Sequence, residues 1–177
     1  FLGPLSATKP WSTKGIEGVY RFLNKIWRLV VNEDGGLNAK ITDAKAEGDA
    51  ERIMHRTIMK VTEDIEDMDM KFNTCVSELM IYVNEISRLE TIPRELIVTL
   101  LKLLAPFAPH LAEELWSRLG NDTTITFAPW PEFNPAKVQK NVVTVIGQIN
   151  GKVRSKIEAP TDTPDDKLIE MMKQDEK

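Results

Sequence analysis

The chain has 177 residues, and its 23 Lys and Arg against 27 Asp and Glu give a formal net charge of −4. One Cys excludes a disulfide framework, and one Cys with two His is too few for a structural zinc site, which takes about four ligands. No apolar run approaches the roughly 20 residues that cross a bilayer, and Phe1-Leu2-Gly3-Pro4 has neither a start Met nor a signal-peptide basic region. We therefore expect a cytoplasmic fragment of a longer protein, with one core and at most a small second domain.

The first predicted helix begins at Ser12 or Thr13, either of which can cap it, and ends near Asp34-Gly35-Gly36, a turn signal. Its core-facing residues recur at helical spacing: Val19, Phe22, Leu23, Ile26 and Val30. The other side carries a basic stripe, which consists of Arg21, Lys25 and Arg28. Residues 33–49 are polar and contain glycine, which predicts a loop.

A second helix is predicted from about Asp49 to Met68, with Met68 as the last residue of its core-facing side. Its other face carries a second basic stripe, Arg52, Arg56 and Lys60, with His55 beside it. The end of this helix is acidic instead: Glu63, Asp64, Glu66, Asp67 and Asp69. Acids at a helix C-terminus oppose the helix dipole, so a polar or repulsive surface role is expected for them.

Three more helices complete a predicted bundle. The third spans about Lys71 to Arg88, and Cys75 lies close to its apolar side as a small core residue. The fourth begins with Pro93 and has almost no polar face, which predicts the buried central helix. The fifth runs from about Pro109 to Leu119, with Gly120 beyond its end. The fold class is therefore mainly α, a bundle of about five helices over 1–126.

The pattern changes after the bundle. Three prolines between Phe127 and Pro135 predict a non-helical linker over 127–140. A β-hairpin follows, with strands at about 142–149 and 152–158 joined by a type I′ turn at Asn150-Gly151. A helix then starts at Thr163-Pro164, so 141–177 reads as an incomplete α+β module. A third basic stripe, Lys152, Arg154 and Lys156, alternates along the second strand.

The residues themselves point to binding rather than catalysis. Gly15-x-x-Gly18 has no preceding strand and is a poor phosphate loop, while His55 and His110 have no nucleophile near them in sequence. Three rows of cations spaced about 5–7 Å apart fit the phosphate repeat of a nucleic acid. Alternatively, the stripes are solvated faces of a helical protein-interaction module, which the negative net charge favours.

Segments along nearly the whole chain resemble a known family. They are Phe1–Gly18, His55–Glu66 with Phe72-Asn73-Thr74, Leu103–Trp116, Pro129-Trp130-Pro131 and Val145–Arg154. Together they resemble the region that follows the catalytic domain of bacterial leucyl-tRNA synthetases. The motif Ala105-Pro106-Phe107-Ala108-Pro109-His110 is shared with valyl and isoleucyl relatives, whereas Asn150-Gly151-Lys152-Val153-Arg154 points to the leucyl branch. Ser155 stands where that branch would have Gly, and Ser suits a strand.

The resemblance implies a fragment of a class I leucine–tRNA ligase, made of the helical anticodon-binding-type domain and the start of the C-terminal domain. A valyl or isoleucyl enzyme is the sibling alternative. The family's signatures His-x-Gly-His and Lys-Met-Ser-Lys-Ser do not occur in this sequence, so we expect no catalytic residue and no metal site here. ATP and Mg would be used by the catalytic domain, outside this chain.

The resemblance also implies partners: tRNA(Leu) and the rest of the parent chain, with no membrane and a monomeric fragment. The predicted tRNA contacts are Arg21, Lys25, Arg28, Arg52, His55, Arg56, Lys60, Lys152 and Arg154. The Trp and Phe residues fall mostly on apolar stripes, so we expect phosphate contacts that position the tRNA rather than bases stacked on aromatic rings.

Overall fold

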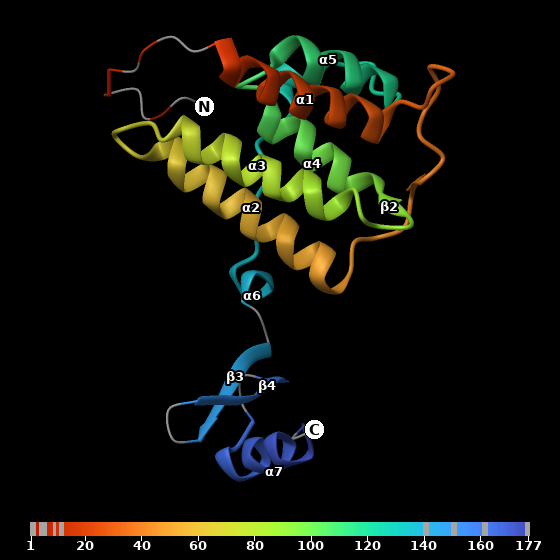
Figure 1. Ribbon diagram of the computed structural model, residues 1–177. Helices are drawn as coiled ribbons and strands as arrows, with labels where there is room; N and C mark the ends of the chain where they lie inside the picture. Colours follow the sequence, from red (N-terminus) through yellow and green to blue (C-terminus); the bar gives the residue numbers. More distant parts are fainter. Residues whose placement is uncertain are drawn as a thin grey trace. The chain divides into compact units, whose positions relative to one another are not determined.

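The computed structural model describes residues 13–139, 142–149, 152–160 and 163–175, together with positions 3, 7, 8 and 10 (Figure 1). They belong to two compact units, Phe1–Val138 and Gln139–Lys177, and each is described here by itself. The predicted mainly α fold class is confirmed. Because Ser12 lies outside the described residues, the predicted cap of the first helix stays a prediction.

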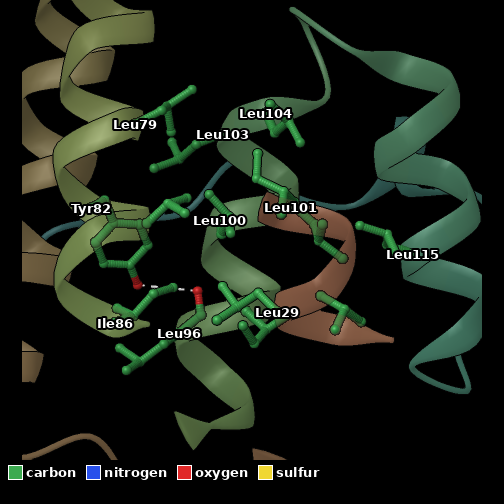
Figure 2. Packing of buried hydrophobic residues seen from close by; sticks show 14 of the residues in the cluster. Leu29, Leu79, Tyr82, Ile86, Leu96, Leu100, Leu101, Leu103, Leu104 and Leu115 are labelled. Carbon is green, nitrogen blue, oxygen red and sulfur yellow. Dashed lines mark hydrogen bonds between the residues drawn. The ribbon is translucent and has the colours of Figure 1, made fainter. Parts of the chain in front are cut away.

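The first unit is a bundle built around α4 (Arg94–Leu104), which contacts α2 (Gly48–Glu66), α3 (Phe72–Ile86) and α5 (Pro109–Arg118). In Figure 1, α1 (Thr13–Val30) and α5 lie on one side of α4, and α2 and α3 lie on the other. The sequence of α4 is apolar nearly all round, and this explains its central place. Its leucines pack against α3 and α5 in Figure 2, where the Tyr82 hydroxyl donates to the Leu96 carbonyl at 3.1 Å.

The first helix ends where its carbonyl groups find other partners. The Asn38 amide donates to the carbonyls of Arg28 and Leu29, each at 3.2 Å, and a turn at Gly35 (φ +83°) reverses the chain. The predicted loop that follows contains a short strand, β1 (Ile41–Thr42), which pairs in parallel with β2 (Ile92–Pro93). A two-residue strand has no detectable period, and sequence patterning therefore missed this pair.

One acid at the end of α2 differs from the surface role that we expected, while Glu63, Glu66 and Asp69 are exposed. Asp64 is only 2% exposed, and its carboxylate accepts from Lys60 Nζ at 2.9 Å and from the Thr74 hydroxyl of α3 at 2.6 Å. Met68 is 99% exposed instead of buried, because α2 ends at Glu66. One of the five acids therefore joins two helices.

The proline-rich segment, which we expected to be a non-helical linker, contains a short helix and contacts α2. It follows a short 3₁₀ turn, η1 (Ile125–Phe127), and contains α6 (Pro135–Val138), which contacts α2. Pro135 begins this helix, a position where proline fits because its missing N–H would have no partner there. The expectation that Pro135 could not be helical was therefore wrong.

In the second unit, β3 (Val142–Ile149) and β4 (Lys152–Pro160) form an antiparallel pair, and α7 (Asp165–Asp175) contacts β4. The register shifts between Gly147 and Gln148. Ser155, Ile157 and Ala159 of β4 are buried, as alternation along a strand requires. The two predicted strands are confirmed, while the predicted turn at Asn150-Gly151 lies outside the described residues.

Candidate nucleic-acid interface

The first basic stripe is exposed on the side of α1 that faces away from the core. Phe22, Ile26 and Leu29 are buried and fix the rotation of the helix, so that Arg21, Lys25 and Arg28 are exposed. Lys25 Nζ donates to the Asn84 side-chain oxygen of α3 at 2.6 Å, and this partner carries no charge. Within the described part of the chain, the stripe makes no ion pair, and its charge is available to an external anion.

The second basic stripe is neutralised by acids of the same chain. Arg52 pairs with Asp49 at 3.0 Å. Arg56 binds Glu78 of α3 through both Nη2 (2.8 Å) and Nε (3.2 Å). Lys60 binds the buried Asp64, and this hydrogen bond raises the pKa of Lys60. Arg56 thus links α2 to α3, and Lys60 does so through Asp64, whereas the Arg52–Asp49 pair lies within α2. The predicted tRNA contacts of these cations stay predictions, and their charge is less available than that of the α1 stripe.

His55 lies beside the second stripe, as predicted, and is already engaged. Its ring Nδ1 accepts a hydrogen bond from the Asn134 backbone N–H at 3.2 Å. Partial burial of the ring lowers the pKa of His55, and the nearby Lys137 ammonium lowers it further. With Nδ1 accepting from Asn134, a neutral ring keeps only its Nε2 N–H for an external acceptor and carries no charge to attract a phosphate.

The side chains of Lys152 and Arg154 lie outside the described residues, although both positions belong to β4. Their predicted tRNA contacts stay predictions.

Three further exposed residues could meet an RNA, and the basic stripes did not identify them. Tyr20, next to Arg21 in sequence, is 67% exposed. Arg88 is exposed near the end of α3 and pairs with Glu85 at 2.9 Å, and Lys40 donates to the Leu89 carbonyl at 3.3 Å. Lys40 comes from a loop and Arg88 from another helix, so no helical period connects them with α1. A search for exposed aromatic residues beside cations would have found Tyr20.

Other chemistry finds little support among the described residues. They contain no group of three or more His, Cys, Asp and Glu that could hold a metal ion, and none of their helices is long and apolar enough to cross a membrane. Burial raises the pKa of the Cys75 thiol to about 11, which disfavours the reactive thiolate. A cavity of about 80 Å³ between α2 and α3 is far below the roughly 300 Å³ of a typical ligand pocket.

Comparisons with known proteins agree with a nucleic-acid interface. The family described as "Anticodon-binding domain of tRNA ligase" matches residues 49–169. The leucine–tRNA ligase of Chlorobium phaeobacteroides is 44% identical over 176 residues, which are 99% of this chain and 22% of that protein. The crystal structure of LeuRS from Agrobacterium radiobacter, in a ternary complex with tRNA and LeuAMS, matches 95% of this chain and 23% of that chain. The TM-score of this match is 0.69 and the sequence identity is 25%. The chain thus spans less than a quarter of the length of either relative.

Proposed function

This chain belongs to the anticodon-binding domain family of tRNA ligases, and on that premise we propose that it docks tRNA(Leu) for a leucine–tRNA ligase. The identity with a leucine–tRNA ligase along almost the whole chain supports the leucine branch over the valyl and isoleucyl ones. In this proposal, leucine activation with ATP and Mg belongs to the part of the relatives that the chain does not span. The proposed location is the cytoplasm, where tRNA is charged.

The proposal rests on the positive charges of α1, which make no ion pair among the described residues. Arg21, Lys25 and Arg28 lie on a rigid helix whose other side is fixed by the core, so their separations are set before any ligand binds. Contacts of this kind hold the phosphate backbone and set the register of an RNA without reading its bases. Register matters to catalysis elsewhere in a synthetase, since a misplacement of about 1 Å can lower a rate roughly 100-fold.

Salt dependence gives the first test. If each cation of α1 meets one phosphate, the affinity of the 177-residue chain for a tRNA(Leu) transcript should fall about 40-fold between 50 and 200 mM salt. An affinity that does not change with salt concentration, or an absence of binding at low salt, would contradict the proposal.

A charge reversal tests the location of the interface. The triple variant Arg21→Glu, Lys25→Glu, Arg28→Glu should keep the helical signal in circular dichroism and lose tRNA binding. A matched control, Lys45→Glu, Lys102→Glu, Lys167→Glu, changes the net charge equally at residues that do not belong to α1 and should bind nearly as well as the wild type. Equal losses in both variants would mean that only net charge matters, and that α1 is not the interface.

A further inference from the structure

The proline-rich segment is attached to one face of α2 by three hydrogen bonds. We call residues 130–138 the strap. The Trp130 indole N–H donates to the Thr62 hydroxyl at 2.9 Å, the Asn134 N–H donates to His55 Nδ1, and Lys137 Nζ donates to Glu51. Glu51, His55 and Thr62 lie on the same face of α2, since they are separated by four and then seven residues.

Besides these hydrogen bonds, the strap covers parts of two aromatic rings but has no fully buried residue. Trp130 remains 38% exposed, Asn134 and Lys137 are exposed, and Phe133 packs against the edge of the core. A segment without fully buried residues opens more easily than the core beneath it. The strap can therefore leave α2 while the bundle stays folded.

The middle hydrogen bond requires a neutral His55. Only an unprotonated Nδ1 can accept from the Asn134 N–H, because both ring nitrogens of imidazolium are donors. The charged groups that face the ring are Glu51 on α2, Glu95 on α4 and Lys137 on α6. Burial and Lys137 outweigh the two acids and lower the pKa of His55. The bond is therefore intact above the ordinary histidine range, near pH 6.5, and is lost as the pH falls through the lowered pKa.

We propose that Glu51, His55 and Thr62 are positioning residues that hold the strap on α2 and release it when His55 takes up a proton. While docked, the strap anchors the chain to the bundle as far as Val138, directly before the second unit. Release moves the last anchored residue back to about Ala128, and the tether to the second unit becomes several times longer.

The consequence for RNA rests on the proposed function. If both units contact the same tRNA, the second contact is intramolecular, and its effective concentration falls roughly as the −3/2 power of tether length. A tether about four times longer then weakens binding of the whole chain on the order of ten-fold. His55 thus acts on the tRNA indirectly, through the strap, rather than as the direct contact predicted from sequence.

Nuclear magnetic resonance on the isotope-labelled 177-residue chain tests whether His55 holds the strap on α2. Between about pH 8 and pH 5, the Asn134 amide and the Trp130 indole signals should shift together with the titration of His55. His55→Ala should show the released signals at every pH. His55→Asn places an amide oxygen where Nδ1 was and cannot titrate, so it should keep the docked signals throughout. His110→Ala, at an exposed histidine far from the strap in sequence, should titrate like the wild type.

Several results would contradict the proposed role of His55 in holding the strap. Asn134 and Trp130 signals in His55→Ala that match the docked wild type would show that the bond does not hold the strap. Released signals in His55→Asn would show that the acceptor is not what matters. A loss of the bundle's own signals in either variant would show that His55 supports the fold rather than the strap.

Affinity for a tRNA(Leu) transcript at about pH 8 tests the positioning role. His55→Ala should bind on the order of ten-fold more weakly, while His55→Asn should bind within about two-fold of the wild type. Equal affinities for all three proteins would refute positioning even if the strap is released. If the wild type itself binds no tRNA, the proposed function fails. The resonance experiment still decides whether protonation of His55 releases the strap.

Discussion

The faces of α1 and α2 look alike in sequence and differ in structure. Each carries three cations at helical spacing, and each helix packs its apolar side into the same core. On α2 the cations meet Asp49, Glu78 and Asp64, whereas on α1 the contact found is with a neutral amide, Asn84. Similar helical spacing therefore leads to cations paired with acids in one helix and to an available cationic surface in the other.

The difference comes from the acids and not from the bases. Glu78 lies on α3, and its carboxylate accepts from Arg56 and also from the Thr57 hydroxyl at 3.3 Å. Asp64 likewise accepts hydrogen bonds from Lys60 and from the Thr74 hydroxyl. A basic stripe is consequently a candidate RNA surface only where neither its own helix nor the neighbouring helix pairs it with an acid.

The largest expected effect comes from breaking the α2 brace at Asp64. Asp64→Ala leaves Lys60 and the Thr74 hydroxyl without their shared acceptor in a nearly buried site. Loss of such charged hydrogen bonds should lower the free energy of unfolding by about 3 kcal/mol. Urea denaturation followed by circular dichroism measures the change.

Asp69→Ala is the matched control, because Asp69 is an exposed acid just after the end of α2 and makes no ion pair among the described residues. Its effect should stay within about 0.5 kcal/mol. Equal stabilities for the two variants would show that the carboxylate of Asp64 does not brace the helices.

A pair of single substitutions compares the two faces directly. Arg28→Ala on α1 should leave stability nearly unchanged and remove one phosphate contact. The fall in tRNA affinity between 50 and 200 mM salt should shrink from about 40-fold to about 12-fold. Arg56→Ala on α2 should instead lower the free energy of unfolding by about 1.5 kcal/mol and leave the salt dependence unaltered, since it breaks the bond to Glu78.

The reverse pattern would contradict the distinction between the faces. A smaller salt dependence in Arg56→Ala would mean that RNA displaces Glu78 and recruits the α2 stripe. An unchanged salt dependence in Arg28→Ala would remove that residue from the interface.

The helices and the hairpin strands could be predicted because their signals are local. The helical period of apolar residues identified α4 as the buried helix, and β-prone runs on either side of Asn150-Gly151 located β3 and β4. Both patterns are complete within a short window of sequence, and tertiary contacts did not override them.

The candidate site was predictable only in part, because charge pairing depends on residues far apart in sequence. Arg56 and Glu78 are 22 positions apart, and Trp130 and Thr62 are 68 apart. Arg52 and Lys60 pair with acids only three and four positions away, whereas the partner of Arg56 lies on another helix, outside any window that detects the stripe. The buried Asp64 was missed for the same reason, since its role appears only when α3 packs against α2.

The smallest expected effect concerns Tyr20, which decides what kind of contact the α1 face makes. The ring is 67% exposed, so Tyr20→Ala should change the free energy of unfolding by less than about 0.5 kcal/mol. If α1 meets only phosphates, the affinity of Tyr20→Ala for tRNA should stay within about two-fold of the wild type, and the salt dependence should not change.

The opposite outcome would show a base contact. A loss of affinity corresponding to about 1–3 kcal/mol, which base stacking on an aromatic ring contributes, would show that an unpaired base stacks on Tyr20. Tyr82→Phe is unsuitable as a control because the buried Tyr82 hydroxyl binds Leu96. Phe127→Ala is a suitable control, since it removes an exposed ring (85%) that does not belong to α1. Fluorescence titration of the two variants against the wild type separates backbone docking from base contact on this face.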